Sequence, residues 1–311
     1  MHAHGDRDNN KQKLNTLMKN YVITGSIGHI SKPIVAGLVK AGKNVTVLTS
    51  NAEKVKEIEG LGAKALVGSV EENAFTKKSF AGADAVYTMI PPIWQTNNWR
   101  ASQHKVADNY SEAIKVNKVK YVVNLSSLGA HLAEGTGPVM ALHDFERSLN
   151  AIPNLNVKHL RPSFFFYNLL NQIGLIKQAG IMGANYGEGD QKIALVHTRD
   201  IADVALDELL NLNFSGNSVR HIISDERTGA DIAKVLGKSI GKDLPWVMFS
   251  DEDQLNGLLN GGVPTSHAAS FVEMGAAFRS GKMQELLSEE KTVGQIKLED
   301  FAKEFEVAYN V

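Results

Sequence analysis

The chain has 311 residues with 33 Lys and Arg against 34 Asp and Glu, and this balance, a net charge of −1, gives no general field that attracts nucleic acid or an anionic membrane. It contains no cysteine, which excludes disulfides, thiolate nucleophiles and thiolate metal ligands, and no apolar run reaches the roughly 20 residues that a membrane span needs. We therefore expect a soluble cytoplasmic protein without a metal site, long enough for one large domain or for a domain with a smaller lobe.

The first 18 residues are polar and charged and lack the apolar core of a signal peptide, so we expect residues 1–18 to form a flexible extension. From Tyr21 to Pro162, short apolar strands alternate with amphipathic helices across short connections. This order predicts a doubly wound α/β fold, with a parallel sheet covered by helices on both faces and a ligand crevice at the carboxyl ends of its strands. Strands are expected at 21–24, 44–49, 64–68, 84–89, 119–125 and 156–161, and helices at 29–41, 52–59, 72–80, 97–115 and 138–150.

A glycine turn connects the first strand to the first helix. Gly25 can take a positive φ at the strand exit, and Gly28, without a Cβ, lets a phosphate approach the backbone. The helix that follows directs its unpaired N–H groups and the positive end of its dipole at the same place. We expect this turn to hold the pyrophosphate of a dinucleotide, although a tight connection without a ligand is the alternative. The expected contacts are Gly25, Ser26, Ile27, Gly28, His29 and Ile30.

The second strand bears on the choice of nucleotide, since it ends Thr49-Ser50-Asn51 without an acidic residue. NAD enzymes of this type place Asp or Glu there to bind the ribose 2′-hydroxyl, and such a carboxylate would repel a 2′-phosphate. We therefore favour NADP(H) over NAD(H), with Thr49, Ser50, Asn51 and Lys54 near the adenosine ribose. Asn51 could also simply cap the next helix, and the two roles are compatible.

The fourth strand leads into Ile90-Pro91-Pro92. We expect Ile90 and Pro91 to border the nicotinamide, although the prolines could equally only terminate the strand. The fifth strand ends at Ser126 and Ser127, whose hydroxyls can reach a cofactor or a substrate oxygen there, but serine pairs at turns also often satisfy local backbone.

The helix after the fifth strand carries His143, which we expect on its flank beside Glu146 and Arg147. A histidine there is a candidate proton donor or substrate contact, and a structural or solvated histidine is the alternative. Between Ser127 and Val157 the chain has no Tyr and no Lys. The Tyr–Lys pair that classical short-chain reductases use for proton transfer is therefore missing.

The alternation changes after Arg161. Residues 163–190 hold three consecutive phenylalanines, five glycines and one short helix at 169–178. A strand at 193–197 and a helix at 200–210 then predict a return to the main sheet, and helices follow at 228–240, 251–260, 264–280 and 297–308. We expect a dinucleotide-binding domain of 19–162 plus 191–225, and a smaller, mostly helical lobe of 163–190 plus 226–311 over the strand ends. Candidate substrate-pocket residues are Pro162, Phe164 and Phe165.

Several segments together resemble the NmrA-like branch of the atypical short-chain dehydrogenase/reductase family: 22–30, 125–130, 135–138 followed by His143 and Glu146, 160–170, and 197–205. The resemblance implies a Rossmann domain, a small C-terminal lobe and NAD(P) in the crevice. The chain departs from the family pattern at Ser31, which replaces the third glycine, and at Ser50, which replaces a basic residue common in NADP-binding relatives. Ser69 stands where many relatives have Asp near the adenine.

Some members of this family are NADPH-dependent quinone or azo-dye reductases, and others bind cofactor without turnover as redox-sensing regulators. We expect an NADPH-dependent reductase of a small quinone-like or carbonyl substrate, because a quinone that accepts hydride needs little acid catalysis from the protein. The alternative is a non-catalytic NAD(P) sensor that acts through a protein partner.

Overall fold

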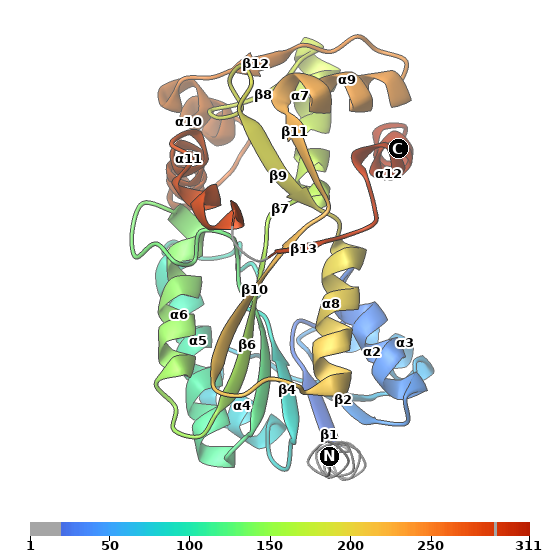
Figure 1. The fold of residues 1–311 in the computed structure, drawn as a ribbon, viewed down its shortest axis with the longest axis vertical. Helices are drawn as coiled ribbons and strands as arrows, with labels where there is room; N and C mark the ends of the chain where they lie inside the picture. Colours follow the sequence, from blue (N-terminus) through green and yellow to red (C-terminus); the bar gives the residue numbers. More distant parts are fainter. Residues whose placement is uncertain (1–19, 289–290) are drawn as a thin grey trace, which may run out of the picture.

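The structure is a computed structural model that describes residues 20–288 and 291–311 (Figure 1), so the extension expected at 1–18 lies outside the described residues. Eight strands form one sheet in which every neighbouring pair is parallel. Their order is β13-β10-β6-β5-β4-β1-β2-β3. The strands are β1 (Asn20–Ile23), β2 (Asn44–Thr49), β3 (Lys64–Val67), β4 (Ala85–Thr88), β5 (Tyr121–Leu125), β6 (Asn156–Pro162), β10 (Asn217–Ile223) and β13 (Lys291–Val293).

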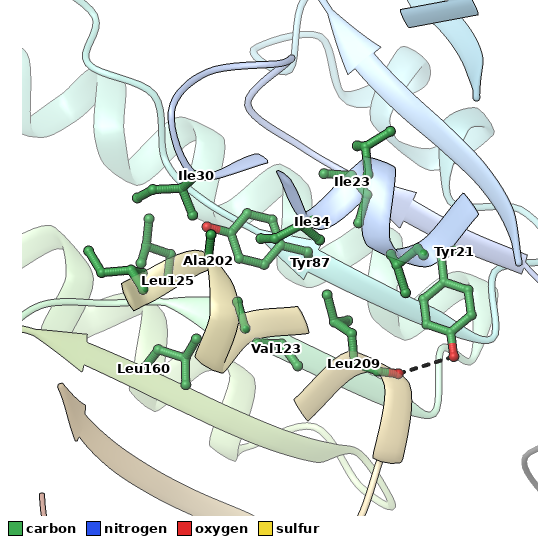
Figure 2. Close-up of a cluster of buried hydrophobic side chains, with 14 of the residues drawn as sticks. Tyr21, Ile23, Ile30, Ile34, Tyr87, Val123, Leu125, Leu160, Ala202 and Leu209 are labelled. Atoms are coloured by element: carbon green, nitrogen blue, oxygen red, sulfur yellow. Dashed lines mark hydrogen bonds between the residues drawn. The ribbon is translucent and has the colours of Figure 1, made fainter. Parts of the chain in front are cut away.

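Helices cover both faces of this sheet, because apolar side chains alternate to both sides of each strand. In β1, Tyr21 and Ile23 enter one core and Val22 enters the other. The first core contains α2 (Ser31–Lys40), α3 (Val55–Gly60) and α8 (Thr198–Asn211), and the second contains α4 (Asn73–Ser79), α5 (Trp99–Asn117) and α6 (Met140–Asn150). Figure 2 shows the first core, where the Tyr21 hydroxyl also donates to the Leu209 carbonyl at 3.1 Å. The doubly wound α/β fold is confirmed.

A smaller lobe stands at the carboxyl ends of the main strands, at the top of Figure 1. It contains a three-stranded sheet, β11-β9-β7, and a two-stranded sheet, β12-β8, packed against helices. Its strands are β7 (Phe164–Phe165), β8 (Met182–Ala184), β9 (Lys192–Val196), β11 (Asp225–Thr228) and β12 (Trp246–Met248). Its helices are η3 (Phe166–Gln172), α7 (Ile173–Ala179), α9 (Gly229–Ser239), α10 (Asp251–Asn260), α11 (Thr265–Arg279), η4 (Lys282–Ser288) and α12 (Leu298–Tyr309). Two short 3-10 turns, η1 (Ala52–Lys54) and η2 (Gly137–Val139), lie in connections between strands of the main sheet.

Two expectations about the sheets are wrong. The strand near 193–197 does not return to the main sheet, because β9 pairs with β11 and β7 in the lobe. The main sheet is extended instead by β10, which was not anticipated, and by β13 from the C-terminal segment assigned to the lobe. The first half of β10 is polar and largely accessible, so its apolar alternation is too weak to reveal a strand. Across the described ranges, no helix combines the length and the apolar character needed to cross a membrane.

Candidate cofactor and substrate site

The glycine turn after β1 has different requirements at its two glycines. Gly25 has a φ of 81°, and a Cβ on it would lie 2.5 Å from the Met89 side chain, so the fold itself requires glycine there. Gly28 is exposed, and a Cβ on it would meet no protein atom within 4 Å. The space over Gly28 is therefore open to a ligand, as a phosphate site requires.

The start of α2 supplies amide groups to the same space. Lys32 N–H bonds to the Gly28 carbonyl at 3.0 Å, while Ile30 at the N-cap position has no side chain that could accept from the first-turn amides. Ser31, at the position of the third family glycine, is buried, and its hydroxyl donates to the Thr24 carbonyl at 3.4 Å. The hydroxyl is thus accommodated where the helix meets the strand. The turn fits the pyrophosphate expected from the sequence.

Ser26 and Thr49 connect the ends of β1 and β2. The Ser26 hydroxyl donates to the Thr49 hydroxyl at 3.0 Å, and Thr49 in turn donates to the Asn51 carbonyl and accepts from the Asn51 N–H, both at 3.2 Å. Thr49 is buried, and its hydroxyl makes all of these hydrogen bonds to other protein groups. The structure therefore places Thr49 under the turn, where it holds the loop.

A pair of lysines lies beside the carboxyl end of β2. Lys54 and Lys32 both bond to the Glu57 carboxylate, at 3.1 Å and 2.9 Å, and these bonds, first from Lys32 and then from Lys54, lower the pKa of Glu57. Lys32 was not anticipated, because it precedes β2 in the chain and approaches this end only through the fold. Asn51 caps η1, since its Oδ1 accepts from Glu53 N–H at 2.8 Å. The neighbouring Ser50 is exposed.

The exits of β3 and β4 hold three further expected contacts. The Ser69 hydroxyl accepts from the Glu71 N–H at 3.2 Å. Ile90 and Pro91 are half-buried immediately after Met89, whose N–H bonds to the Thr24 hydroxyl at 2.8 Å. This bond fixes the start of the β4 exit against the glycine turn.

A buried ion pair lies below the end of β5. The Arg161 guanidinium donates to both oxygens of Glu146, at 3.0 Å and 2.6 Å, and the Ser126 hydroxyl donates to the same carboxylate at 2.5 Å. Glu146, expected only as a neighbour of His143 on the flank of its helix, is 4% exposed, because Arg161 on β6 and Ser126 on β5 satisfy its charge inside the protein. The sequence analysis did not anticipate this pair, since Glu146 and Arg161 lie on different elements.

His143 has one nitrogen fixed and the other free. Nδ1 lies 2.9 Å from the Ala130 carbonyl, which can only accept, so Nδ1 carries the hydrogen. In the part of the chain that the structure describes, the buried Nε2 has no hydrogen-bond partner. The ring is thus held through Nδ1, and Nε2 is the nitrogen left without a partner among the described residues. The Ser127 hydroxyl donates to the Leu128 carbonyl at 3.0 Å. This is a local backbone contact, the alternative that the sequence analysis gave for this serine.

The lobe reaches the glycine turn through Tyr167 in η3. Its ring packs against His29 in a tilted contact with 3.9 Å between ring centroids. Burial, followed by the charge of Glu304, raises the pKa of its hydroxyl. Phe164 and Phe165 are half-buried, and Phe164 packs against the lobe residues Tyr186 and Phe278.

Pro162 is buried at the end of β6, where its carbonyl accepts from the Leu128 N–H at 2.9 Å. Its ring therefore belongs to the join between the main sheet and the lobe.

Within residues 20–288 and 291–311, no group of three or more His, Asp or Glu side chains could hold a metal ion.

The model of a family described as NAD(P)H-binding matches residues 25–211. An NAD(P)H azoreductase from Xenophilus azovorans is 23% identical over 255 residues, which cover 81% of this chain and 85% of that protein. The fold is similar to that of a Citrobacter sp. triphenylmethane reductase in complex with NADP(H), with a TM-score of 0.74, 18% identity, and coverage of 92% and 99% of the two chains. It is also similar to an Escherichia coli NADPH-dependent quinone oxidoreductase, with a TM-score of 0.73, 19% identity, and coverage of 91% and 99%.

Proposed function

Because the chain belongs to the NAD(P)H-binding family, we propose that it is an NADPH-dependent oxidoreductase that reduces a small quinone-like or carbonyl substrate by hydride transfer. The relatives that carry reductase names, an azoreductase, a triphenylmethane reductase and a quinone oxidoreductase, support this proposal. The observation that carries it is His143, whose Nδ1 is bound to a carbonyl and whose buried Nε2 has no hydrogen-bond partner among the described residues.

In this proposal, the turn from Gly25 to Ile30 holds the pyrophosphate through backbone N–H groups at the start of α2. The strand order β5-β4-β1-β2 sets the direction of the dinucleotide. The adenosine half lies over the end of β2, and the nicotinamide half lies toward Ile90, Pro91 and the end of β5. Ser69 at the end of β3 lies on the adenine side.

We favour NADP(H) over NAD(H) because β2 ends without an acidic residue and two lysines lie beside that end. Lys32 and Lys54 meet at Glu57, and their side chains are 52% and 45% exposed, so both ammonium groups can turn toward a 2′-phosphate. Ser50 and Asn51 add neutral hydrogen-bonding groups at the same place. A 2′-phosphate gains charge-assisted hydrogen bonds from such lysines, which a 2′-hydroxyl does not.

When bound, NADPH supplies a hydride, and reduction of a quinone or carbonyl then needs one proton at the substrate oxygen. In the proposed reaction, His143 protonated at Nε2 donates that proton to the substrate oxygen, and solvent restores it after the product leaves, while the Ala130 carbonyl holds the ring in place through Nδ1–H. Ser127 orients the substrate oxygen from the end of β5. A hydroquinone anion is a weaker base than an alkoxide, so a quinone depends less on His143 than a carbonyl does.

The test combines titration of the purified protein with NADPH and NADH with NADPH oxidation over a panel of quinones, dyes and carbonyls. His143→Gln keeps a polar side chain but removes the proton donor, and we expect it to lower kcat more for carbonyls than for quinones without changing the Kd for NADPH. His104→Gln, on the exposed side of α5 opposite Asp144, is the matched control. Tight NADPH binding without turnover of any member of the panel would contradict the reductase proposal.

A further inference from the structure

Four aromatic rings form one continuous group where the β4–α5 loop meets the lobe. The His267 ring of α11 packs against Trp94 of the loop, at 5.3 Å and an interplanar angle of 18°, and against Trp99, the first residue of α5, at 4.3 Å and 16°. The two tryptophan rings also stack on each other, at 5.8 Å and 26°. Phe271, one turn further along α11, meets Trp99 edge-on at 5.3 Å. The group therefore joins the main domain and the lobe through stacked rings.

The centre of this group has little freedom to move. His267 is fully buried, its Nε2 donates to the Ile93 carbonyl at 3.2 Å, and its Nδ1 accepts from the Ser266 hydroxyl at 3.3 Å. With both nitrogens bonded, the plane of the ring is set. Trp99 behind it is 6% exposed, so the stack is anchored in the core.

Trp94 stands apart from the other members of the group because half of its surface is open. Its side chain is 49% exposed, and it is the one aromatic residue among the exposed large apolar side chains of the described chain. Because Trp94 packs against Trp99, His267 and Phe271, its exposed ring is held on a rigid support.

Trp94 also lies close in the chain to the proposed site. Its loop leaves β4 at Met89, which contacts Gly25, and passes Ile90 four residues before Trp94. On the other side, α11 is packed on Gly137 through the Ser270 backbone, too closely for any Cβ, and Gly137 begins the turn that leads into the helix of His143. The ring group therefore lies on the loop that carries the proposed nicotinamide wall and beside the turn that leads into the helix of His143.

We infer that Trp94 is a specificity-determining residue, a stacking platform for the flat aromatic part of the substrate. This inference rests on the proposed function. The electron-rich face of tryptophan favours an offset stack with an electron-poor ring such as a quinone, whereas an aliphatic carbonyl gains little from it. His267 and Trp99 hold the platform in place, so the substrate does not have to order it on binding.

The experiment compares naphthoquinone with diacetyl, an aliphatic diketone, in the full-length protein. Trp94→Ala is expected to raise the KM for naphthoquinone about tenfold while kcat/KM for diacetyl changes less than about twofold, and Trp94→Phe to recover most of the loss. Trp246→Phe in the lobe is the matched control and should leave both substrates unchanged. The chain has no cysteine for the quinone to alkylate, so the kinetics report binding and turnover.

A second measurement separates this inference from the proposed reductase activity. Naphthoquinone is titrated in the presence of NADP⁺, where no reduction takes place, and quenching of tryptophan fluorescence is followed. Quenching that is lost in Trp94→Ala but kept in Trp246→Phe supports the platform even if no turnover is found. Equal loss of activity toward both substrates in Trp94→Ala, or equal quenching in the wild type and Trp94→Ala, would overturn it.

Discussion

The rings of His29 and Tyr167 meet in a tilted contact across the join between the glycine turn and the C-terminal lobe, with 3.9 Å between their centroids and 37° between their planes. His29 immediately follows the open Gly28, and Tyr167 lies in the first turn of η3, which packs on α12 through Phe301. A residue of the proposed pyrophosphate site is therefore in direct contact with the lobe over the strand ends.

A double-mutant cycle measures this contact. We expect His29→Ala and Tyr167→Ala to show a coupling of about 0.5–1.5 kcal/mol in the free energy of unfolding, the range for a stacked ring pair. Tyr167→Phe should retain the coupling, since it keeps the ring and loses only the hydroxyl. Denaturant titrations of the four proteins give the values, and strictly additive effects would show that the rings are adjacent without interacting.

A side chain added at Gly28 should affect cofactor binding, whereas one added at Gly25 should affect stability. Gly28→Val is expected to weaken NADPH binding more than about tenfold without lowering the Tm, because its side chain occupies the phosphate space but meets no protein atom. Gly25→Val should lower the Tm, since the added Cβ meets Met89 and the φ is positive. Gly60→Val, at an equally open glycine at the end of α3, is the control. Unchanged NADPH affinity in Gly28→Val would remove the pyrophosphate site from this turn.

The lysine pair at Glu57 predicts a change specific to NADP(H). Lys54→Ala should weaken NADPH binding about tenfold and leave NADH binding unchanged, because only NADPH carries the 2′-phosphate. Glu57→Gln should strengthen NADPH binding, since it releases both lysines from their present partner. Isothermal titrations with both nucleotides decide the matter, and parallel changes for NADPH and NADH would place the lysines away from the ribose.

The buried pair of Glu146 and Arg161 predicts a large cost when one partner is removed. Glu146→Gln should lower the free energy of unfolding by about 3–5 kcal/mol, because it leaves the Arg161 guanidinium buried without a counter-charge. The double variant Glu146→Leu with Arg161→Met should recover most of this loss. Asp144→Asn, on the exposed side of the same helix, is the control and should cost little. If Glu146→Gln lowers the free energy of unfolding no more than Asp144→Asn does, Arg161 does not depend on Glu146 for its counter-charge.

His159 predicts a loss of stability in mild acid. Burial, only partly offset by the charge of Glu146, lowers the pKa of this histidine from 6.5 to about 4 in the folded protein. As the pH falls below 6.5 the unfolded chain binds the proton first, so stability present above that pH declines until the folded pKa is reached. The loss between pH 7 and pH 5 should be about 2 kcal/mol.

His159→Gln provides the control for this pH dependence. The Nδ1 and Nε2 atoms of His159 lie 3.1 Å and 2.9 Å from Asn124 and Asn150, and a glutamine amide can replace these contacts without titrating. Melting curves of the variant should therefore show a smaller decrease in Tm between the two pH values. Equal slopes for both proteins would mean that other groups cause the acid sensitivity.

Much of the nucleotide-binding half was predictable because its signals are local. The turn from Gly25 to Gly28, the acid-free end of β2 and the periodicity of α2 all lie within thirty or so consecutive residues, where chain connectivity alone brings them together. The assignment of β9 failed for the opposite reason. A short apolar strand pairs equally well in two sheets, and only contacts with β7 and β11 decide which one it joins.

The amino-acid sequence by itself determined the fold class, the family and the glycine turn after the first strand, because each depends on residues close together in the chain. Only the tertiary structure decided what surrounds that turn. It brought Tyr167 onto His29, Lys32 toward Lys54, Arg161 under Glu146 and His267 against two tryptophans. Such pairs depend on burial and on charges that must be neutralised across distant segments, and residue spacing along the chain carries no record of either.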